Sequence, residues 1–570
     1  MSRRLKSRRN RPARRGGFLR KLAGLLIIAA GACALVLFVL PNPFHTDPEW
    51  KGKDKPIFIK GEFTGYSASG EGEQLLLPLP LLQKAVDPAI RYEAGTKSVI
   101  LTTDRKLLLM QADKKAAALN NQPVQLRLAP VEKGGVTLLP AESLKNLYGL
   151  DVQENKDTGA VLLMTAGESV PLGVVKENKT SMRSEATIHA PILSKMGKGT
   201  KLRIWKKQDD WLYVQMDNGY AGYVKASAVQ DNGTKTVEKP KSPPTRAESS
   251  WKGKAVNLTW EAVYTSNPDT SSLGTLKGVN VVSPTWFNIV DGQGNVRSQG
   301  DPAYVTWAHA KDKEVWGLLS NSFDADLTTK ALSTYENRMR TIEQMMEYAD
   351  LYGLDGINID FENVYTDDGD NVTQFVRELR PMAQAKNLIL SIDVTPKSNS
   401  EMWSLFFDRR ALGELVDFMI VMAYDEHWAS SPVAGSVASL SWSQTAMERI
   451  LDEDDVPADK LILGVPLYTR IWSEQSVDGK TKVSSKSVGM NRVATIIGTK
   501  KLKPVLSKET GQNYVEYREN GVLNKIWIED KVSLQSRVKL AKSLKLAGIA
   551  SWNRSFAGEG AWETLNTIHK

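Results

Sequence analysis

Apolar, β-rich runs alternate with helical patterns throughout residues 253–570. Eight such runs predict strands, at residues 255–260, 278–283, 314–320, 356–362, 388–393, 418–424, 461–467 and 548–552. Between them, residues 341–352 place Ile342, Met345, Met346 and Ala349 on one face of a helix. Strands that alternate with helices predict a parallel sheet, and eight of them are the number that closes a (β/α)8 TIM barrel.

A small α+β insertion is predicted between the seventh and eighth strands. Residues 514–517 and 523–528 flank Glu519-Asn520-Gly521, which is a turn signal for a hairpin.

Upstream, residues 73–166 contain a two-fold repeat that predicts an α+β domain. Leu76-Leu77-Pro78 recurs 62 positions later as Leu138-Leu139-Pro140, and Val99-Ile100-Leu101 recurs at the same offset as Val161-Leu162-Leu163. Each unit predicts an apolar strand, a proline, a short helix and a strand pair. The pattern resembles the copper amine oxidase N-terminal-like domain of bacterial surface proteins. The resemblance implies a spacer or wall-contacting module without copper chemistry.

Residues 167–230 show short alternating strands separated by polar turns, such as 201–205, 211–214 and 219–224. With Ser181-Met182-Arg183-Ser184, they resemble a bacterial SH3-type domain, a small β-barrel often attached to wall hydrolases. Trp211 fits the core of such a barrel or, as the alternative, a peptide groove. By composition, residues 41–72 are predicted to form a stalk and residues 231–252 a linker.

The N-terminus combines a basic tail with an apolar segment. Residues 1–21 hold ten Lys and Arg and no acid, so the remainder has 74 − 10 = 64 basic against 65 acidic residues. The excess of positive charge therefore belongs to the tail, which argues against a nucleic-acid partner. Residues 22–40 carry no charge and would rise roughly 28 Å as a helix, about the thickness of a bilayer core.

These features predict one transmembrane helix, a cytoplasmic tail and an extracellular remainder, and hence a single-pass cell-membrane protein. A cleaved signal peptide is the alternative, but its apolar region is usually only about 7–15 residues long. Cys33, the one cysteine, lies inside this segment, so the remainder has no intramolecular disulfide.

The fourth predicted barrel strand carries the chemistry. Side chains alternate along a strand, so Asn358, Asp360 and Glu362 point into the barrel while Ile357 and Phe361 point toward the helices. Glu362 then lies at the carboxyl end, where barrel active sites form. Two buried carboxylates cost stability unless something compensates them, which favours a catalytic purpose over a structural one.

The run from Asp355 to Glu362 resembles the Asp-Gly-x-Asp-x-Asp-x-Glu signature of glycoside hydrolase family 18, with Asn358 at the second Asp. Residues 421–425, 463–468 and 548–552 resemble the sixth, seventh and eighth strands of that family. The run Tyr424-Asp425-Glu426-His427 is similar to the branch of spore-cortex and peptidoglycan N-acetylglucosaminidases, in which Asn is common at position 358.

The resemblance implies roles for individual residues in substrate-assisted, retaining hydrolysis. Glu362 is expected to act as general acid and base, Asp360 to stabilise the oxazolinium ion, and Tyr424 to donate to the acetamide oxygen. The expected substrate-binding residues are Asn358, Asp425, Trp552, Met422 and Trp286, with Trp552 as the floor under the sugar. No metal or organic cofactor is expected, since His309 and His427 are too scattered to form a metal site.

The leading hypothesis is a cell-surface hydrolase of β-1,4-linked N-acetylglucosamine glycan, with peptidoglycan as the favoured substrate. A chitinase would use the same residues and stays an alternative. Two further alternatives stay open: a lectin-like protein that binds glycan, and a scaffold that binds the wall without cutting it.

Overall fold

The computed structural model describes residues 16–240, 244–477 and 480–570, without the side chains of 16–20 and 32–38. It divides into two compact units. The first comprises the residues up to Pro88 together with Ala112–Lys115 and Leu126–Lys241. The second comprises Ala89–Gln111, Ala116–Gln125 and Ser242–Lys570.

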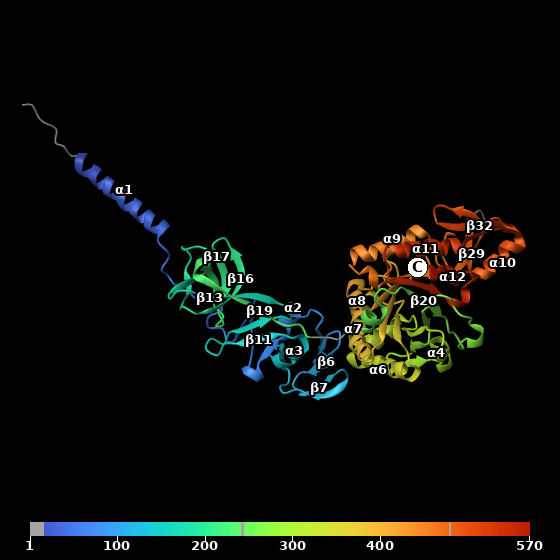
Figure 1. The fold of residues 1–570 in the computed structure, drawn as a ribbon, viewed down its shortest axis with the longest axis horizontal. Helices are drawn as coiled ribbons and strands as arrows, with labels where there is room; N and C mark the ends of the chain where they lie inside the picture. Colours follow the sequence, from blue (N-terminus) through green and yellow to red (C-terminus); the bar gives the residue numbers. More distant parts are fainter. Residues whose placement is uncertain (1–15, 241–243, 478–479) are drawn as a thin grey trace, which may run out of the picture. The chain divides into compact units, whose positions relative to one another are not determined.

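Helix α1 (Gly16–Val39) contains most of the apolar segment predicted over 22–40 (Figure 1). Among the residues that the structure describes, no helix is long and apolar enough to cross a membrane, so the predicted transmembrane helix is not found there. Most of the basic tail predicted over 1–21 lies outside the described residues.

The stalk predicted over 41–72 is wrong for its second half. Strands β1 (Pro56–Ile59) and β2 (Glu62–Ser67) join β11 (Asp151–Glu154) and β12 (Val161–Met164) in one sheet. Phe58 is buried there and packs edge-on against Trp50, with ring centroids 5.3 Å apart. Apolar burial therefore outweighs the loop-like composition of the segment.

The internal repeat is confirmed. Strand β3 (Leu76–Pro78) pairs antiparallel with β10 (Val136–Pro140), so that Leu77 of the first unit lies opposite Leu139 of the second. The helices α2 (Leu79–Ala85) and α3 (Ala141–Tyr148) begin directly after the two prolines. A strand, a proline and a short helix thus occur twice.

The small β domain predicted over 167–230 is present, and it extends to residue 236. Its seven strands form one antiparallel sheet: β13 (Ser169–Val175), β14 (Thr180–Arg183), β15 (Ile192–Met196), β16 (Lys201–Gln208), β17 (Trp211–Gln215), β18 (Ala221–Lys225) and β19 (Val229–Thr236). Trp211 is buried, as the core interpretation expects. The SH3 type of this domain stays a prediction.

In the second unit, a five-stranded sheet packs on the barrel. It consists of β4 (Arg91–Glu93), β5 (Ser98–Thr102), β6 (Leu107–Gln111), β7 (Ala116–Leu119) and β8 (Gln122–Gln125). Ile100 and Leu107 belong to the same buried apolar cluster as the barrel helices. Arg338 of the barrel donates to Glu93 of the sheet at 2.8 Å.

The predicted parallel barrel is confirmed with all eight strands. They are β20 (Val256–Glu261), β21 (Val281–Pro284), β24 (Glu314–Ser320), β25 (Gly356–Asp360), β26 (Ile389–Val394), β27 (Phe418–Val421), β28 (Leu461–Pro466) and β34 (Gly548–Trp552). Their order is β21-β20-β34-β28-β27-β26-β25-β24, and pairing of β21 with β24 closes the ring. Because β25 and β27 end early, Glu362 and Tyr424 lie just beyond the strand ends.

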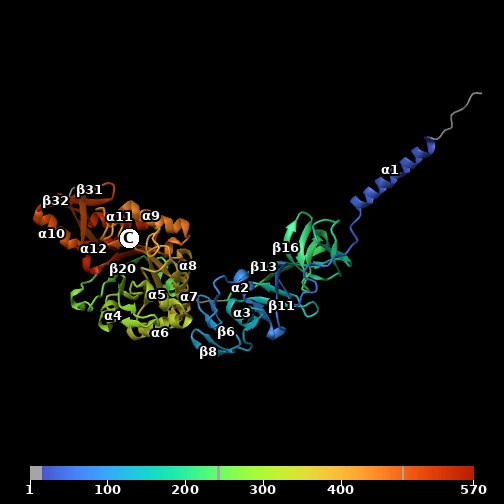
Figure 2. The same ribbon diagram turned by 180° about the vertical axis from the view of Figure 1, so that it is seen from behind.

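Helices cover the outside of the barrel (Figure 1; Figure 2). They are α4 (Pro302–His309), α5 (Ala325–Leu332), α6 (Tyr335–Tyr352), α7 (Gly369–Ala385), α8 (Arg409–Leu415), α9 (Leu440–Glu453), α11 (Lys531–Ser543) and α12 (Ala561–Leu565). Helix α6 starts where the Thr334 side chain accepts from the amide of Asn337, and it ends at Gly353 with φ of 70°. A hydroxyl N-cap and a left-handed glycine are the usual ends of such a helix.

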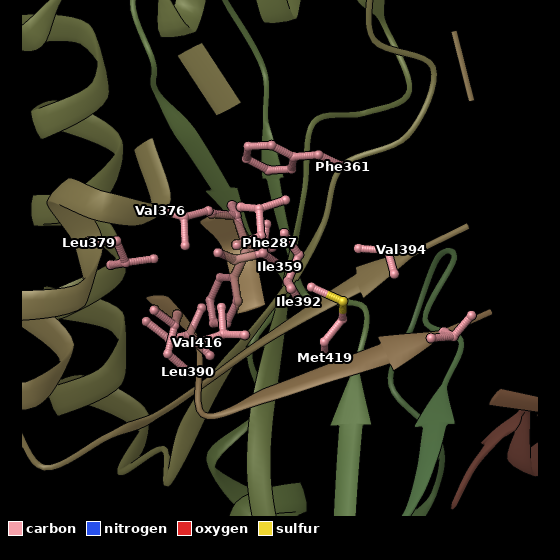
Figure 3. Close-up of a cluster of buried hydrophobic side chains, with 14 of the residues drawn as sticks. Phe287, Ile359, Phe361, Val376, Leu379, Leu390, Ile392, Val394, Val416 and Met419 are labelled. Atoms are coloured by element: carbon pink, nitrogen blue, oxygen red, sulfur yellow. The ribbon is translucent and has the colours of Figure 1, made fainter. Parts of the chain in front are cut away.

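The predicted alternation along β25 is confirmed. Ile359 and Phe361 lie in the apolar layer beside Val376 and Leu379 of α7 (Figure 3). The side chain of Asn358 instead reaches across the barrel interior to β26. The helix-facing layer stabilises the strand, and it leaves the polar side chains inside the barrel.

The linker predicted over 231–252 is wrong at its C-terminal end, because this end closes the amino side of the barrel. The turn η3 (Ala247–Trp251) buries Trp251 against Trp316 and Phe418, with ring centroids 5.8 and 6.2 Å apart. Arg246 forms an ion pair with Asp355 at 2.9 Å, so that this aspartate holds the segment against the barrel.

The predicted insertion is confirmed and is larger than the hairpin alone. It contains β29 (Tyr468–Val477), β30 (Lys480–Gly489), α10 (Met490–Lys500), β31 (Val505–Ser507), β32 (Gln512–Glu519) and β33 (Val522–Ile528). Asn520 and Gly521 make the turn between β32 and β33 with positive φ.

Candidate active site

A cavity of about 470 Å³ lies at the carboxyl ends of the barrel strands. Most of the predicted site residues line it, namely Asp360, Glu362, Met422, Tyr424, Asp425 and Trp552. They come from β25, from the segment after β27 and from β34, so closure of the barrel brings together residues that are far apart in the sequence.

Two predicted substrate-binding residues do not line the cavity. Trp286 is 0% exposed, and its indole donates to Asn267 at 2.6 Å while its ring packs edge-on against Tyr304. Trp286 does follow the carboxyl end of a barrel strand, β21, but its side chain packs into the core on the helix side and not into the cavity. Asn358 is also fully buried and lies beneath the cavity, where it contacts protein groups only.

The position of Glu362 is set by a pair of hydrogen bonds from Asn321, the residue that follows β24. The side chain of buried Asn321 accepts from the backbone amide of Glu362 at 3.1 Å and donates to its carbonyl at 2.8 Å. This clamp holds the peptide directly after β25 and leaves the carboxyl group in the cavity. Burial, followed by the charges of Asp360 and Asp425, raises the pKa of Glu362 well above its ordinary value.

Asp360 lies deeper than Glu362 on the same face of the strand. It is 6% exposed, and its Oδ1 atom is buried without a hydrogen-bond partner in the described structure. Burial raises the pKa of Asp360 from 3.8 to about 7. A carboxyl group with such a pKa can change its protonation state near neutral pH.

Aromatic rings surround the acid pair. Trp260 is buried and contacts Trp552 with ring centroids 5.8 Å apart and Tyr424 with centroids 6.4 Å apart. Burial raises the pKa of Tyr424 well above its ordinary value, so its hydroxyl stays a neutral donor. The rings supply an apolar surface suited to the face of a sugar.

Asp425 is held by the insertion. Its Oδ1 atom accepts from the Tyr468 hydroxyl at 2.6 Å and from Arg470 at 3.0 Å. Both donors lie at the start of β29, so the inserted domain positions a residue at the cavity wall.

Sequence reasoning missed three residues that shape this site: Asn321, Arg470 and Asp393. Asp393 carried a usable signal, because it ends the fifth predicted strand with the parity that points into the barrel. Asn321 and Arg470 act through hydrogen bonds to residues more than 40 positions away in the sequence, for which strand alternation provides no signal.

No metal centre is evident in the described part of the chain, where no group of three or more His, Cys, Asp or Glu is placed to hold an ion. His309 contacts Asp355 at 2.8 Å, and His427 contacts the carbonyl of Ser436 at the same distance. Both histidines thus serve local structure.

The closed parallel barrel, with an acid of raised pKa in the cavity at its carboxyl end, has the architecture of a TIM-barrel enzyme. Residues 310–557 match the model of glycosyl hydrolases family 18. The barrel is therefore a glycosyl hydrolase family 18 domain. Residues 64–163 match the model of the copper amine oxidase N-terminal domain, in accord with the repeat.

Individual relatives agree with this assignment. The chain is 27% identical over 332 residues to the uncharacterized glycosylase YvbX of Bacillus subtilis (strain 168), covering 55% of this chain and 92% of that protein. It is 27% identical to the cortical fragment-lytic enzyme of Bacillus anthracis, covering 44% of this chain but only 58% of the relative. The spore cortex-lytic enzyme SleL of Bacillus cereus shares the fold, with a TM-score of 0.51 and 19% identity. The superposition covers 60% of this chain and 78% of that structure.

Proposed function

We propose that this protein hydrolyses a β-1,4-linked glycan that contains N-acetylglucosamine, with peptidoglycan as its substrate. The observation that carries the proposal is the position of Glu362, whose carboxyl group faces an open cavity directly above the buried Asp360. The raised pKa of Glu362 leaves a proton available for the leaving oxygen near neutral pH.

The reaction proceeds in two steps. Glu362 protonates the glycosidic oxygen while the acetamide oxygen of the substrate attacks the anomeric carbon, so the glycosidic bond breaks and an oxazolinium ion forms. Glu362 then removes a proton from water, which attacks the anomeric carbon and reopens the ring with retention of configuration. Asp360 faces the positive ring as an anion, and the Tyr424 hydroxyl donates to the acetamide oxygen.

The arrangement of the carboxylates favours the acetamide as nucleophile. Asp360 ends β25 and Glu362 follows two residues later on the same side, so they do not flank a sugar from opposite sides. Asp425 is engaged by Tyr468 and Arg470. A substrate with a hydroxyl in place of the acetamide is therefore expected to react at least about a hundredfold more slowly, since the step would lose its nucleophile.

Two features of the chain favour peptidoglycan over chitin as the substrate. Relatives named cortical fragment-lytic enzymes are similar in sequence to the barrel. A small β domain lies upstream of the barrel, and its sequence resembles modules attached to wall hydrolases. Location at the outer face of the cell membrane, anchored through residues 22–40, is proposed from the sequence alone. Membrane fractionation of cells that express the full chain tests this location.

The decisive experiment compares the wild type with Glu362→Gln on purified peptidoglycan, with the released fragments analysed by mass spectrometry. The variant keeps the shape of the side chain but loses the titrating proton, so product release is expected to fall at least about a thousandfold. The matched control is Glu347→Gln, which changes an exposed glutamate on α6 and should leave turnover unaltered.

The alternatives make different predictions. Equal product release from wild type and Glu362→Gln would exclude catalysis by this residue. Binding of sacculi without release of any fragment by the wild type would identify a glycan-binding protein instead. Cleavage of chitin oligomers but not of sacculi would identify a chitinase.

A further inference from the structure

The cavity wall contains a third buried carboxyl group, Asp393, at the carboxyl end of β26. It is 1% exposed and lines the cavity together with Asp360 and Glu362. Its Oδ2 atom accepts two hydrogen bonds, from Asn358 Nδ2 at 2.7 Å and from Trp260 Nε1 at 3.2 Å. This oxygen is therefore fully engaged as an acceptor.

Asn358 is oriented so that it can only donate to Asp393. Its Oδ1 atom accepts from the Ser391 hydroxyl at 2.7 Å, which turns the amide nitrogen toward Asp393. Since Ser391 and Asp393 lie two positions apart on β26, they face the barrel interior side by side. The chain Ser391–Asn358–Asp393 thus fixes one carboxyl oxygen and leaves the other, Oδ1, free to carry a proton.

The Oδ1 atoms of Asp393 and Asp360 are both buried without a hydrogen-bond partner in the described structure. The charges of Asp360 and Glu362 both act on Asp393, and Arg297 lines the same cavity. Burial, followed by the charge of Asp360, raises the pKa of Asp393 well above its ordinary value. The neutral hydroxyl of Tyr424 completes the surroundings from the end of β27.

Asp360 and Asp393 are buried in the wall of one cavity and their charges repel, which favours one proton retained between them. The doubly engaged Oδ2 of Asp393 directs that proton to its Oδ1. This assignment rests on the proposed function for its role in the reaction, but the protonation itself can be measured without substrate.

We propose that Asp393 is a positioning residue for hydrolysis, which keeps a proton on Oδ1 and donates it to Oδ1 of Asp360. The donated hydrogen bond holds Asp360 as an anion facing the substrate. Asn358 on β25 cannot donate this bond, because its amide is engaged by Asp393 and Ser391, so the donor comes from β26. No proton enters or leaves the pair during turnover, so the positive oxazolinium ion meets one negative charge.

The test uses the full chain and two substitutions at the same position. Asp393→Asn keeps a donor, since its carbonyl can accept from Asn358 and Trp260 while its amide donates to Asp360. Asp393→Ala removes the donor. We expect kcat of Asp393→Asn within about threefold of the wild type. For Asp393→Ala we expect kcat lowered about tenfold or more, with KM changed less than about threefold.

The pH profile separates this role from a merely structural one. Without the donor, ionisation of Asp360 becomes harder, so the acid limb of kcat/KM for Asp393→Ala is expected to move to higher pH. The limb for Asp393→Asn is expected to stay at or below that of the wild type. Equal losses in both variants with superimposable profiles would overturn the proposal.

An infrared measurement decides the protonation independently of the glycan. The difference spectrum of wild type minus Asp393→Asn at about pH 8 should contain the band of a protonated carboxyl group. Asp452→Asn, which changes an exposed aspartate, should lose no such band. A spectrum without the band overturns the shared proton, whereas failure of the wild type to cleave any N-acetylated glycan overturns the proposed function only.

Discussion

Replacement of Asp360 by Asn tests the electrostatics of the site through the stability of the barrel. Burial raises the pKa of Asp360 from 3.8 to about 7, so the folded barrel binds this proton more tightly than the unfolded chain does. The contribution of Asp360 to the free energy of unfolding therefore falls as the pH rises from about 4 to about 7. At ~1.4 kcal/mol for each unit of pKa, the loss reaches about 4 kcal/mol above pH 7.

Asp360→Asn removes this titration while it keeps a side chain of similar shape. We expect the variant to be more stable than the wild type above about pH 7, by up to about 4 kcal/mol, and the difference to vanish toward about pH 4. Urea unfolding followed by pulse proteolysis measures the intact barrel fragment separately from the upstream domains. Exposed Asp452→Asn is the control. A stability difference between Asp360→Asn and the wild type that is constant from pH 4 to 8 would refute the reasoning.

Two further substitutions probe the site and its support. Tyr424→Phe removes the hydroxyl from the cavity wall but keeps the ring contacts, so kcat on peptidoglycan should fall about tenfold to a hundredfold while KM changes little. Arg338→Met removes the cation that lies 2.7 Å from Glu378 and 2.8 Å from Glu93. Arg91 stays 3.7 Å from Glu93, whereas Glu378 loses its ion-pair partner. Pulse proteolysis should then report a loss of about 3–5 kcal/mol at neutral pH, which shrinks at low pH as the glutamates bind protons. Exposed Arg340→Met is the control for this loss, and an equal effect of both would contradict the explanation.

Strand β25 and the residues after it show how much strand alternation can predict. Asp360 and Glu362 were predicted to face the barrel interior, and both line the cavity. The prediction succeeded because the period of two along a strand is a local property of the backbone. Trp286 shows the limit, because it follows a short strand in a segment whose direction changes, and its side chain entered the helix-facing core instead.

The boundaries of the domains were harder to predict from the sequence than the helices and strands. The composition of residues 41–72 and 231–252 is that of loops, yet Phe58 and Trp251 are buried in the folded structure. Composition averages over a window, whereas a single aromatic side chain that finds a pocket is enough to order its segment.

By itself, the sequence determined the eight strands of the barrel, the internal repeat and the two carboxylates of β25, because hydrophobic periodicity and local turn chemistry are encoded in neighbouring residues. Only the tertiary structure decided that Asp393, Asn358 and Trp260 meet beneath Asp360, and that Arg470 of the insertion holds Asp425. These contacts join residues more than 30 positions apart and depend on which strands become neighbours when the barrel closes. That order is a property of the whole barrel, and no local pattern contains it.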